Sequence, residues 1–315
     1  MERIGLFFES WDFFGEAALA SGMAGALLGA LGIYILLGRL VFMSVTTAQV
    51  SSAGVALAFW LTGLAGAGAS SMHDHAQDLE AATASPLVAM LSPGVFSILF
   101  TIAVMAVANI WVRRSRSPEA ILAVLYLFGA AATVLIGTQI VHELSDVQQL
   151  LIGNAVLVAH EDFVGLAVLA SVMLVLFAVF HRGLEASAFW PQTAKVAGLP
   201  VRVINAIRLI ALTVAIAYTT RVMGALPVFA FSCLPALAAR ACAPNLRVMF
   251  FVALGIGACS GFCGYVAAFV LDMPVGPVQT AVSLMFVFVL VSVSAYVKWV
   301  QREQIDKELK DEKEQ

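Results

Sequence analysis

Long stretches without a charged side chain or histidine recur along the chain, and their length sets the architecture. There are eight of them: Ala17–Gly38, Leu40–Met72, Ala81–Val112, Ala120–Val141, Phe163–Phe180, Val222–Ala239, Val248–Leu271 and Met273–Val297. A helix needs about 20 apolar residues to cross about 30 Å of hydrocarbon, because each residue advances about 1.5 Å. The pattern therefore predicts a chain that crosses a bilayer many times.

These stretches are apolar on every side, and this periodicity predicts the fold class. A membrane-spanning barrel would show segments of about ten residues in which apolar and polar positions alternate. A helix satisfies its own backbone N–H and C=O groups, as hydrocarbon requires. We therefore predict an all-α, polytopic membrane bundle. Composition agrees, since 61% of residues are apolar and only 12% charged, and mean hydropathy is +0.96, whereas soluble domains carry about 25% charged residues.

The charges between the stretches alternate in sign and predict the orientation. Alternate loops are basic: Arg39; Arg113, Arg114 and Arg116; Arg182, Lys195 and Arg202; Arg240 and Arg247; Lys298 and Arg302. Because positively charged loops stay in the cytoplasm, we predict an outer N-terminus and a cytoplasmic C-terminus. The alternation requires one further span containing Leu209–Thr220, which brings the count to nine; eight spans is the alternative.

The two ends of the chain and its cysteines add little further chemistry. Residues 1–300 are predicted to form the transmembrane domain, and residues 301–315, with four bases and six acids, a charged cytoplasmic tail. Four acids and one arginine in the first 16 residues do not favour a cleavable signal peptide. All four cysteines fall in or beside apolar stretches, which argues against a disulfide framework.

Two segments could meet a polar solute. Residues 44–52 are unusually polar for a span, and they predict either hydrogen bonds between helices or the wall of a translocation path. His73, Asp74 and His75 lie in the first outer loop, where imidazole and carboxylate groups could bind zinc or manganese. An ordinary solvated loop is the alternative for these three residues.

The longest cytoplasmic loop contains a short predicted helix. Pro191 can begin it, Gly198 can end it, and Pro200 prevents its continuation. Such a helix could bind a soluble partner. No Walker A, GxSxG or HExxH motif occurs in the chain, so we predict that this chain is not an enzyme.

Several blocks, in this order, resemble the permease subunit of ATP-binding-cassette importers for zinc, manganese and iron. The blocks are Arg39–Ala58, Leu151-Ile-Gly-Asn154 with Asp162 following, Phe189–Gly198, Met223–Arg240 and Leu271-Asp-Met-Pro-Val-Gly276. The resemblance extends from about Gly22 to Leu290. It implies a permease in a bacterial cytoplasmic (inner) membrane.

The resemblance also implies partners and site residues. The partners are membrane lipid, a second copy of the chain, an extracytoplasmic solute-binding protein and a cytoplasmic ATPase that binds ATP and Mg, with no cofactor in this chain and no nucleic acid. The substrate path would include Val45, Thr46, Gln49 and Ser52. Coupling to the ATPase would involve Pro191, Gln192, Ala194, Lys195 and Gly198.

At two places the sequence departs from this family. Val45 and Gln49 stand where an aspartate and a histidine usually meet the metal, and Trp190 and Gln192 stand where acids are usual. Valine cannot bind a cation, and glutamine offers only a neutral oxygen. Three functions therefore remain open: an importer permease for zinc or manganese, the same architecture carrying a metal chelate or a small neutral solute, and a secondary transporter without an ATPase.

Overall fold

The computed structural model describes Phe7 and residues 11–38, 41–64, 93–115, 117–140, 158–189 and 191–314. Its helices are α2 (Trp11–Leu37), α3 (Val41–Leu64), α6 (Pro93–Arg114), α7 (Pro118–Ile140), α9 (His160–Phe189), α10 (Pro191–Val196), α11 (Val201–Met223), α12 (Ala225–Cys242), α13 (Leu246–Leu271) and α14 (Val275–Glu314). Within these ranges, nine helices are long and apolar enough to cross a membrane. The all-α membrane bundle is confirmed, with nine spans among the described residues, and α11 supplies the one that the charge pattern required.

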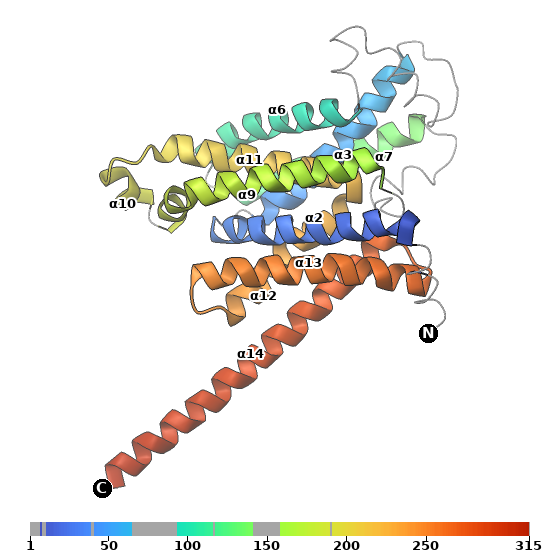
Figure 1. Cartoon of the computed structure of the whole chain (residues 1–315). Coiled ribbons are helices and arrows are strands. Elements are labelled where there is room, and N and C mark those ends of the chain that lie inside the picture. The colour runs from blue at the N-terminus through green and yellow to red at the C-terminus, as the bar shows by residue number, and fades with distance from the viewer. Residues whose placement is uncertain are drawn as a thin grey trace.

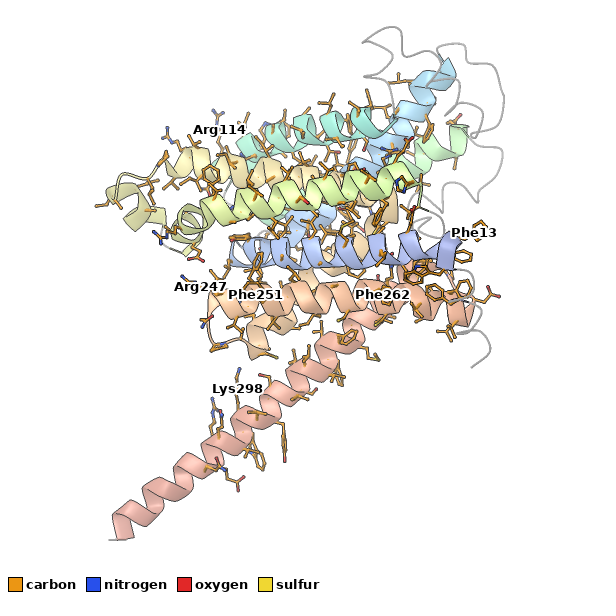
Figure 2. All side chains as sticks on the ribbon, in the orientation of Figure 1. Phe13, Arg114, Arg247, Phe251, Phe262 and Lys298 are labelled. Carbon is orange, nitrogen blue, oxygen red and sulfur yellow. The ribbon has the colours of Figure 1, made fainter. Side chains whose placement is uncertain are left out.

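The bundle has two faces, which we name by α10. The helices α2, α9 and α12 end at the face that carries α10, whereas α3, α11 and α13 begin there (Figure 1). We call this the α10 face and the other the opposite face. Arg114, Arg247 and Lys298 all lie toward the α10 face (Figure 2). These three members of the alternating basic set thus lie at one face of the bundle.

The most extensive contact in the bundle joins α2 and α13, which lie side by side (Figure 1). Its centre is a pair of glycines. A Cβ atom added to Gly25 would collide with the Gly257 carbonyl oxygen, and one added to Gly257 would collide with the Gly25 carbonyl oxygen. Glycine is needed here because only a missing side chain lets two backbones approach this closely, and hydrocarbon supplies no hydrophobic force to hold helices together.

Two tight turns between spans depend on unusual backbone conformations. Gly224 alone separates α11 from α12, with φ 88° and ψ 163°, a region that essentially only glycine adopts. At the end of α13, Asp272 is left-handed with φ 58°, and the Met273 amide donates to the Ala268 carbonyl. Pro274 then prevents the helix from continuing, and α14 begins at the next residue.

The last helix leaves the bundle obliquely (Figure 1). The helix α14 is 40 residues long and runs without a break through residue 300, so the boundary at 300/301 stays a prediction. Near the α10 face, Ser294 Oγ and Lys298 Nζ donate to the Ala241 carbonyl oxygen at 2.6 and 2.9 Å. These bonds satisfy a carbonyl in the last turn of α12, which has no partner within its own helix.

Candidate functional site

The polar helix α3 lies at the centre of the bundle and contacts α6, α7, α11 and α12. Its hydroxyl groups make bonds to each of these helices. Ser44 Oγ lies 3.6 Å from Cys233 Sγ of α12, and Thr46 Oγ1 donates to the Leu122 carbonyl of α7 at 2.9 Å. The prediction of hydrogen bonds between helices is therefore confirmed for this segment.

A second set of bonds joins α3 to α6 and α11. The Ser51 and Ser97 hydroxyl oxygens are 3.0 Å apart, and Ser97 Oγ donates to the Ser51 carbonyl at 2.9 Å. Ser51 Oγ also lies 3.2 Å from the Ala217 carbonyl oxygen of α11. Both serine side chains are completely buried. Three helices thus meet at one small polar layer.

Two other hydroxyls in α3 bond within their own helix. Thr47 Oγ1 donates to the Met43 carbonyl at 2.7 Å, and Ser52 Oγ donates to the Ala48 carbonyl at 3.2 Å. Both side chains are buried. A hydroxyl that bonds four residues back satisfies itself without a neighbouring helix, so these two do not join helices.

Val45 and Gln49 share one face of α3, because they are one turn apart. Both side chains are half-buried. The other two residues of the predicted path, Thr46 and Ser52, have buried side chains. Gln49 Oε1 is buried and accepts no hydrogen bond from any described residue. An unsatisfied buried oxygen is costly, so this atom is suited to a polar group that passes or binds there.

The described residues contain no ready-made metal centre. No group of three or more His, Cys, Asp or Glu side chains occurs among them, and the four cysteines are free, as expected. His73, Asp74 and His75 lie outside the described residues. Their role as metal ligands stays a prediction.

Charged side chains gather at the opposite face of the bundle. Arg221 Nη2 of α11 lies 3.5 Å from Asp162 Oδ1 of α9, and the Tyr218 hydroxyl donates to the Asp162 carbonyl at 3.4 Å. His160 Nδ1 lies 2.8 Å from Glu16 Oε1 of α2. Asp162, the acid that follows Leu151–Asn154 in the sequence blocks, is thus the partner of Arg221 in the structure.

One other arginine on α11 has no such partner. Arg208 lies two turns from the start of the helix, and its Nη1 atom is buried with no hydrogen-bond partner among the described residues. The Asn205 Oδ1 atom, one turn earlier on the same helix, is in the same condition. A basic group at this depth does not favour a bare cation on that side of α11.

The predicted short helix is present, and the glycine that follows it accounts for the way the helix ends. The helix α10 covers Pro191–Val196. The Leu199 amide donates to the Ala194 carbonyl and the Gly198 amide to the Lys195 carbonyl, with Gly198 at φ 79°. This is a Schellman end, in which glycine adopts the left-handed conformation. Ala194 is buried, whereas Gln192 and Lys195 are exposed.

Comparison with known proteins places this geometry in a family. Residues 10–295 match the family described as ABC 3 transport family. The chain belongs to that family. As an ABC 3 protein it is a membrane-spanning permease of an ABC transporter, and the resemblance drawn from the sequence blocks is confirmed.

Individual relatives are distant but match most of the chain. A protein of Chlamydia muridarum, described as a probable metal transport system membrane protein, is 22% identical over 262 residues, which is 83% of this chain and 81% of that protein. The ABC 3 chain is also similar to two solved structures. One, PsaBC from Streptococcus pneumoniae in complex with Fab, has 20% identity and a TM-score of 0.73, with 91% of this chain and 95% of that one covered.

The second solved structure shows an inward-facing conformation of a protein assigned to the metal-chelate type of ABC transporter. Its identity is 16% and its TM-score 0.67, with 88% of this chain and 84% of that one covered. At such identities, the two structures establish the fold and nothing about the cargo.

Proposed function

We propose that two copies of this permease form the membrane pathway of an ATP-driven importer for a divalent metal, zinc or manganese. The match to the ABC 3 family over residues 10–295 carries this proposal, and the metal-transport description of the Chlamydia relative supports the cargo. The permease would lie in a bacterial cytoplasmic membrane with its N-terminus outside. The ATPase and an extracytoplasmic solute-binding protein would be separate chains, and ATP and Mg would bind to the ATPase.

The α10 face is the side that would meet the ATPase. Arg114, Arg247 and Lys298 lie toward this face (Figure 2), and basic segments favour the cytoplasm. The helix α10 is held by its buried Ala194 while Gln192 and Lys195 remain exposed. Movement of the ATPase could therefore be transmitted through α10 to α9 and α11, which it contacts.

Deletion of the gene tests the cargo. In medium low in metals, we expect less cell-associated zinc or manganese in the deletion strain, and restoration by the intact gene. Zinc, manganese and iron contents that all equal those of the parent strain would exclude the metal proposal.

Co-purification tests the coupling segment. We expect the paired substitution Gln192→Ala and Lys195→Ala to reduce the amount of ATPase that co-purifies with the tagged permease. It leaves the Schellman end intact, since that end uses backbone atoms and Gly198. Arg240→Ala, at an exposed position in the last turn of α12 on the same face, is the matched control. If both variants retained equally little ATPase, α10 would not be a specific part of the ATPase contact.

The composition of α3 favours a second candidate, in which the cargo is a metal chelate or a small neutral solute. No ionisable side chain stands at position 45 or 49, and a metal ion without an anionic ligand is poorly held. We expect Gln49→Ala to reduce transport of whichever cargo uses this path. Thr47→Val is the control, because Thr47 bonds within its own helix. Unchanged transport by the Gln49→Ala variant would show that Gln49 is not part of the path.

A further inference from the structure

A groove lined only by apolar side chains runs between α2, α9 and α13. The helix α2 lies between the other two (Figure 1) and forms the floor, while α9 and α13 each pack on α2 and form the walls. The cavity has a volume of about 110 Å³. Because an apolar cavity of about 150 Å³ takes up a benzene molecule, this one has room for several methylene groups.

The groove occupies the half of the bundle nearer the α10 face. On α13, Phe250 and Leu254 line it at about 6 and 12 Å from the first residue of the helix. On α2, Leu31 and Met23 line it at about 9 and 21 Å from the last residue. Since one leaflet contributes about half of the 30 Å of hydrocarbon, the groove extends from near the α10 face to about the middle of the bilayer.

One side of the groove opens to the membrane. Leu174, at its rim on α9, is 57% exposed, whereas Met173 and Phe177 beneath it are 6% and 3% exposed. An unfilled space against an apolar surface loses dispersion contacts. In a bilayer, the hydrocarbon available to fill such a space is an acyl chain.

A basic side chain lies next to the groove at the depth of lipid headgroups. Arg247 precedes Phe250 by three residues and therefore shares its face of α13. It lies toward the α10 face (Figure 2), is exposed, and makes no ion pair with a described residue. Arginine can extend to the membrane surface and bind phosphate through two parallel hydrogen bonds. The groove and Arg247 thus match the two parts of a phospholipid.

A second copy of the chain is not expected to cover this groove. On α3, Ser44 lies against α12 and Thr46 bonds to α7, so Val45, which follows Ser44 by about 100° around the helix, points between α12 and α7. The helices that pack mainly on α3 include neither α9 nor α13. A copy that completes the path at Val45 would therefore lie on the α7 and α12 side.

Given the orientation of the proposed function, we infer that this groove binds one phospholipid of the cytoplasmic leaflet. An acyl chain lies between α2, α9 and α13, and the phosphate lies on Arg247. The bound chain packs α9 against α2 and α13, and α9 leads directly into α10. The lipid therefore stabilises the helix that holds the proposed ATPase contact in place.

Titration with a lipid tests the phosphate contact. The full-length permease is purified in dodecyl maltoside, and palmitoyl-oleoyl phosphatidylglycerol is added while native mass spectrometry counts the bound lipids. We expect one lipid per chain to bind more tightly than any further lipid. Arg247→Ala should raise its Kd about fivefold, as expected for an exposed charge contact. Arg240→Ala, an exposed base on α12 at the same face but outside the groove, is the matched control.

A lipid without a phosphate shows whether Arg247 acts through the headgroup. Palmitoyl-oleoyl glycerol has the same acyl chains, so it should bind the intact permease about fivefold more weakly than phosphatidylglycerol. It should bind the Arg247→Ala variant as well as it binds the intact permease. A Kd that Arg247→Ala raises equally for both lipids would contradict the phosphate contact.

A substitution that fills the groove tests the acyl-chain contact. Ala170 lines the groove on α9, and Ala170→Phe should raise the Kd of phosphatidylglycerol at least tenfold. Val168→Phe is the matched control, because Val168 is 57% exposed on the same helix outside the groove. If Ala170→Phe aggregates, the comparison of the two lipids with Arg247→Ala still decides the proposal.

Several results would overturn the lipid site. They are equal affinities in Ala170→Phe and Val168→Phe, equal affinities in Arg247→Ala and Arg240→Ala, or a dimer that Ala170→Phe separates while the lipid stays bound. The last result would assign the groove to the second copy. All of these measurements use purified permease, so a gene deletion that leaves metal contents unchanged would remove the metal proposal and keep the lipid site.

Discussion

The α2–α13 contact and the surroundings of α3 hold helices together by opposite means. Between α2 and α13, backbone meets backbone at Gly25 and Gly257, with no side chain in between. Around α3, side-chain hydroxyls of Ser44, Thr46 and Ser51 reach atoms of four neighbouring helices. The α2–α13 contact requires that both glycines lack a side chain, whereas the contacts of α3 require a few polar side chains.

This difference separates a fixed part of the molecule from one that can rearrange. Glycine contacts spread dispersion over many atoms, and any shift loses many of them together. Hydroxyl bonds are few, each is worth about 0.6 kcal/mol in a membrane, and a serine or threonine can satisfy itself within its helix when the neighbour moves away. We therefore expect α2 and α13 to move as one body, and α3, α6 and α11 to exchange partners.

The largest expected effect is at the glycine contact. Gly257→Ala places a methyl group against the Gly25 carbonyl, and neither backbone can yield locally. Overpacking usually costs about 1–3 kcal/mol, and a contact between two backbones should reach about 3 kcal/mol or more. We expect most of the purified variant to aggregate on size-exclusion chromatography in mild detergent.

A matched control lies two residues away on the same helix. Gly255→Ala would meet nothing within 4 Å, so it should remain monodisperse with an unchanged melting temperature. If Gly257→Ala were equally well behaved, the α2–α13 contact would not be the fixed part of the bundle.

The spans, their alternation and the short helix α10 could be read from the sequence, because each depends on neighbouring residues. Uncharged length sets a span, and Pro191 and Gly198 set the two ends of α10. The span Val201–Met223 was harder, since Arg208 and Arg221 interrupt it. It was found only from the alternation of charged loops.

The contacts among spans could not be read in the same way, because they join residues far apart in the chain. Gly25 and Gly257 are both in glycine-rich stretches, but nothing in those stretches says which pair meets. The predicted path segment shows the same limit. Its polarity predicted two alternatives, hydrogen bonds between helices or the wall of a path. Only the positions of α6, α7 and α11 show that Thr46 and Ser51 bond to neighbouring helices, whereas the Gln49 Oε1 atom has no hydrogen-bond partner among the described residues.

An intermediate effect is expected at the junction of α3, α6 and α11. Ser97→Ala removes the donor to the Ser51 carbonyl and the contact between the two hydroxyls. Two bonds of this kind should cost about 1 kcal/mol of unfolding free energy, measured by titration with SDS in mixed micelles. In a double-mutant cycle with Ser51→Ala, the two substitutions should cost less together than the sum of each alone. Strict additivity would mean that the two serines do not interact.

The smallest expected change in stability comes from comparing two adjacent threonines of α3. They differ in whether the hydroxyl also contacts a neighbouring helix. Thr46 and Thr47 each have a hydroxyl 2.7 Å from a carbonyl oxygen four residues back, but only the Thr46 hydroxyl also lies 2.9 Å from a carbonyl oxygen of another helix, that of Leu122, and shares its single proton between the two acceptors. Substitution by valine places a methyl group against the same kind of carbonyl in both, so this local cost cancels in the comparison. Thr46→Val should therefore be less stable than Thr47→Val by about 0.6 kcal/mol in the same SDS titration. Equal stabilities would show that α3 is held by packing alone, and the contrast with the glycine contact of α2 and α13 would then disappear.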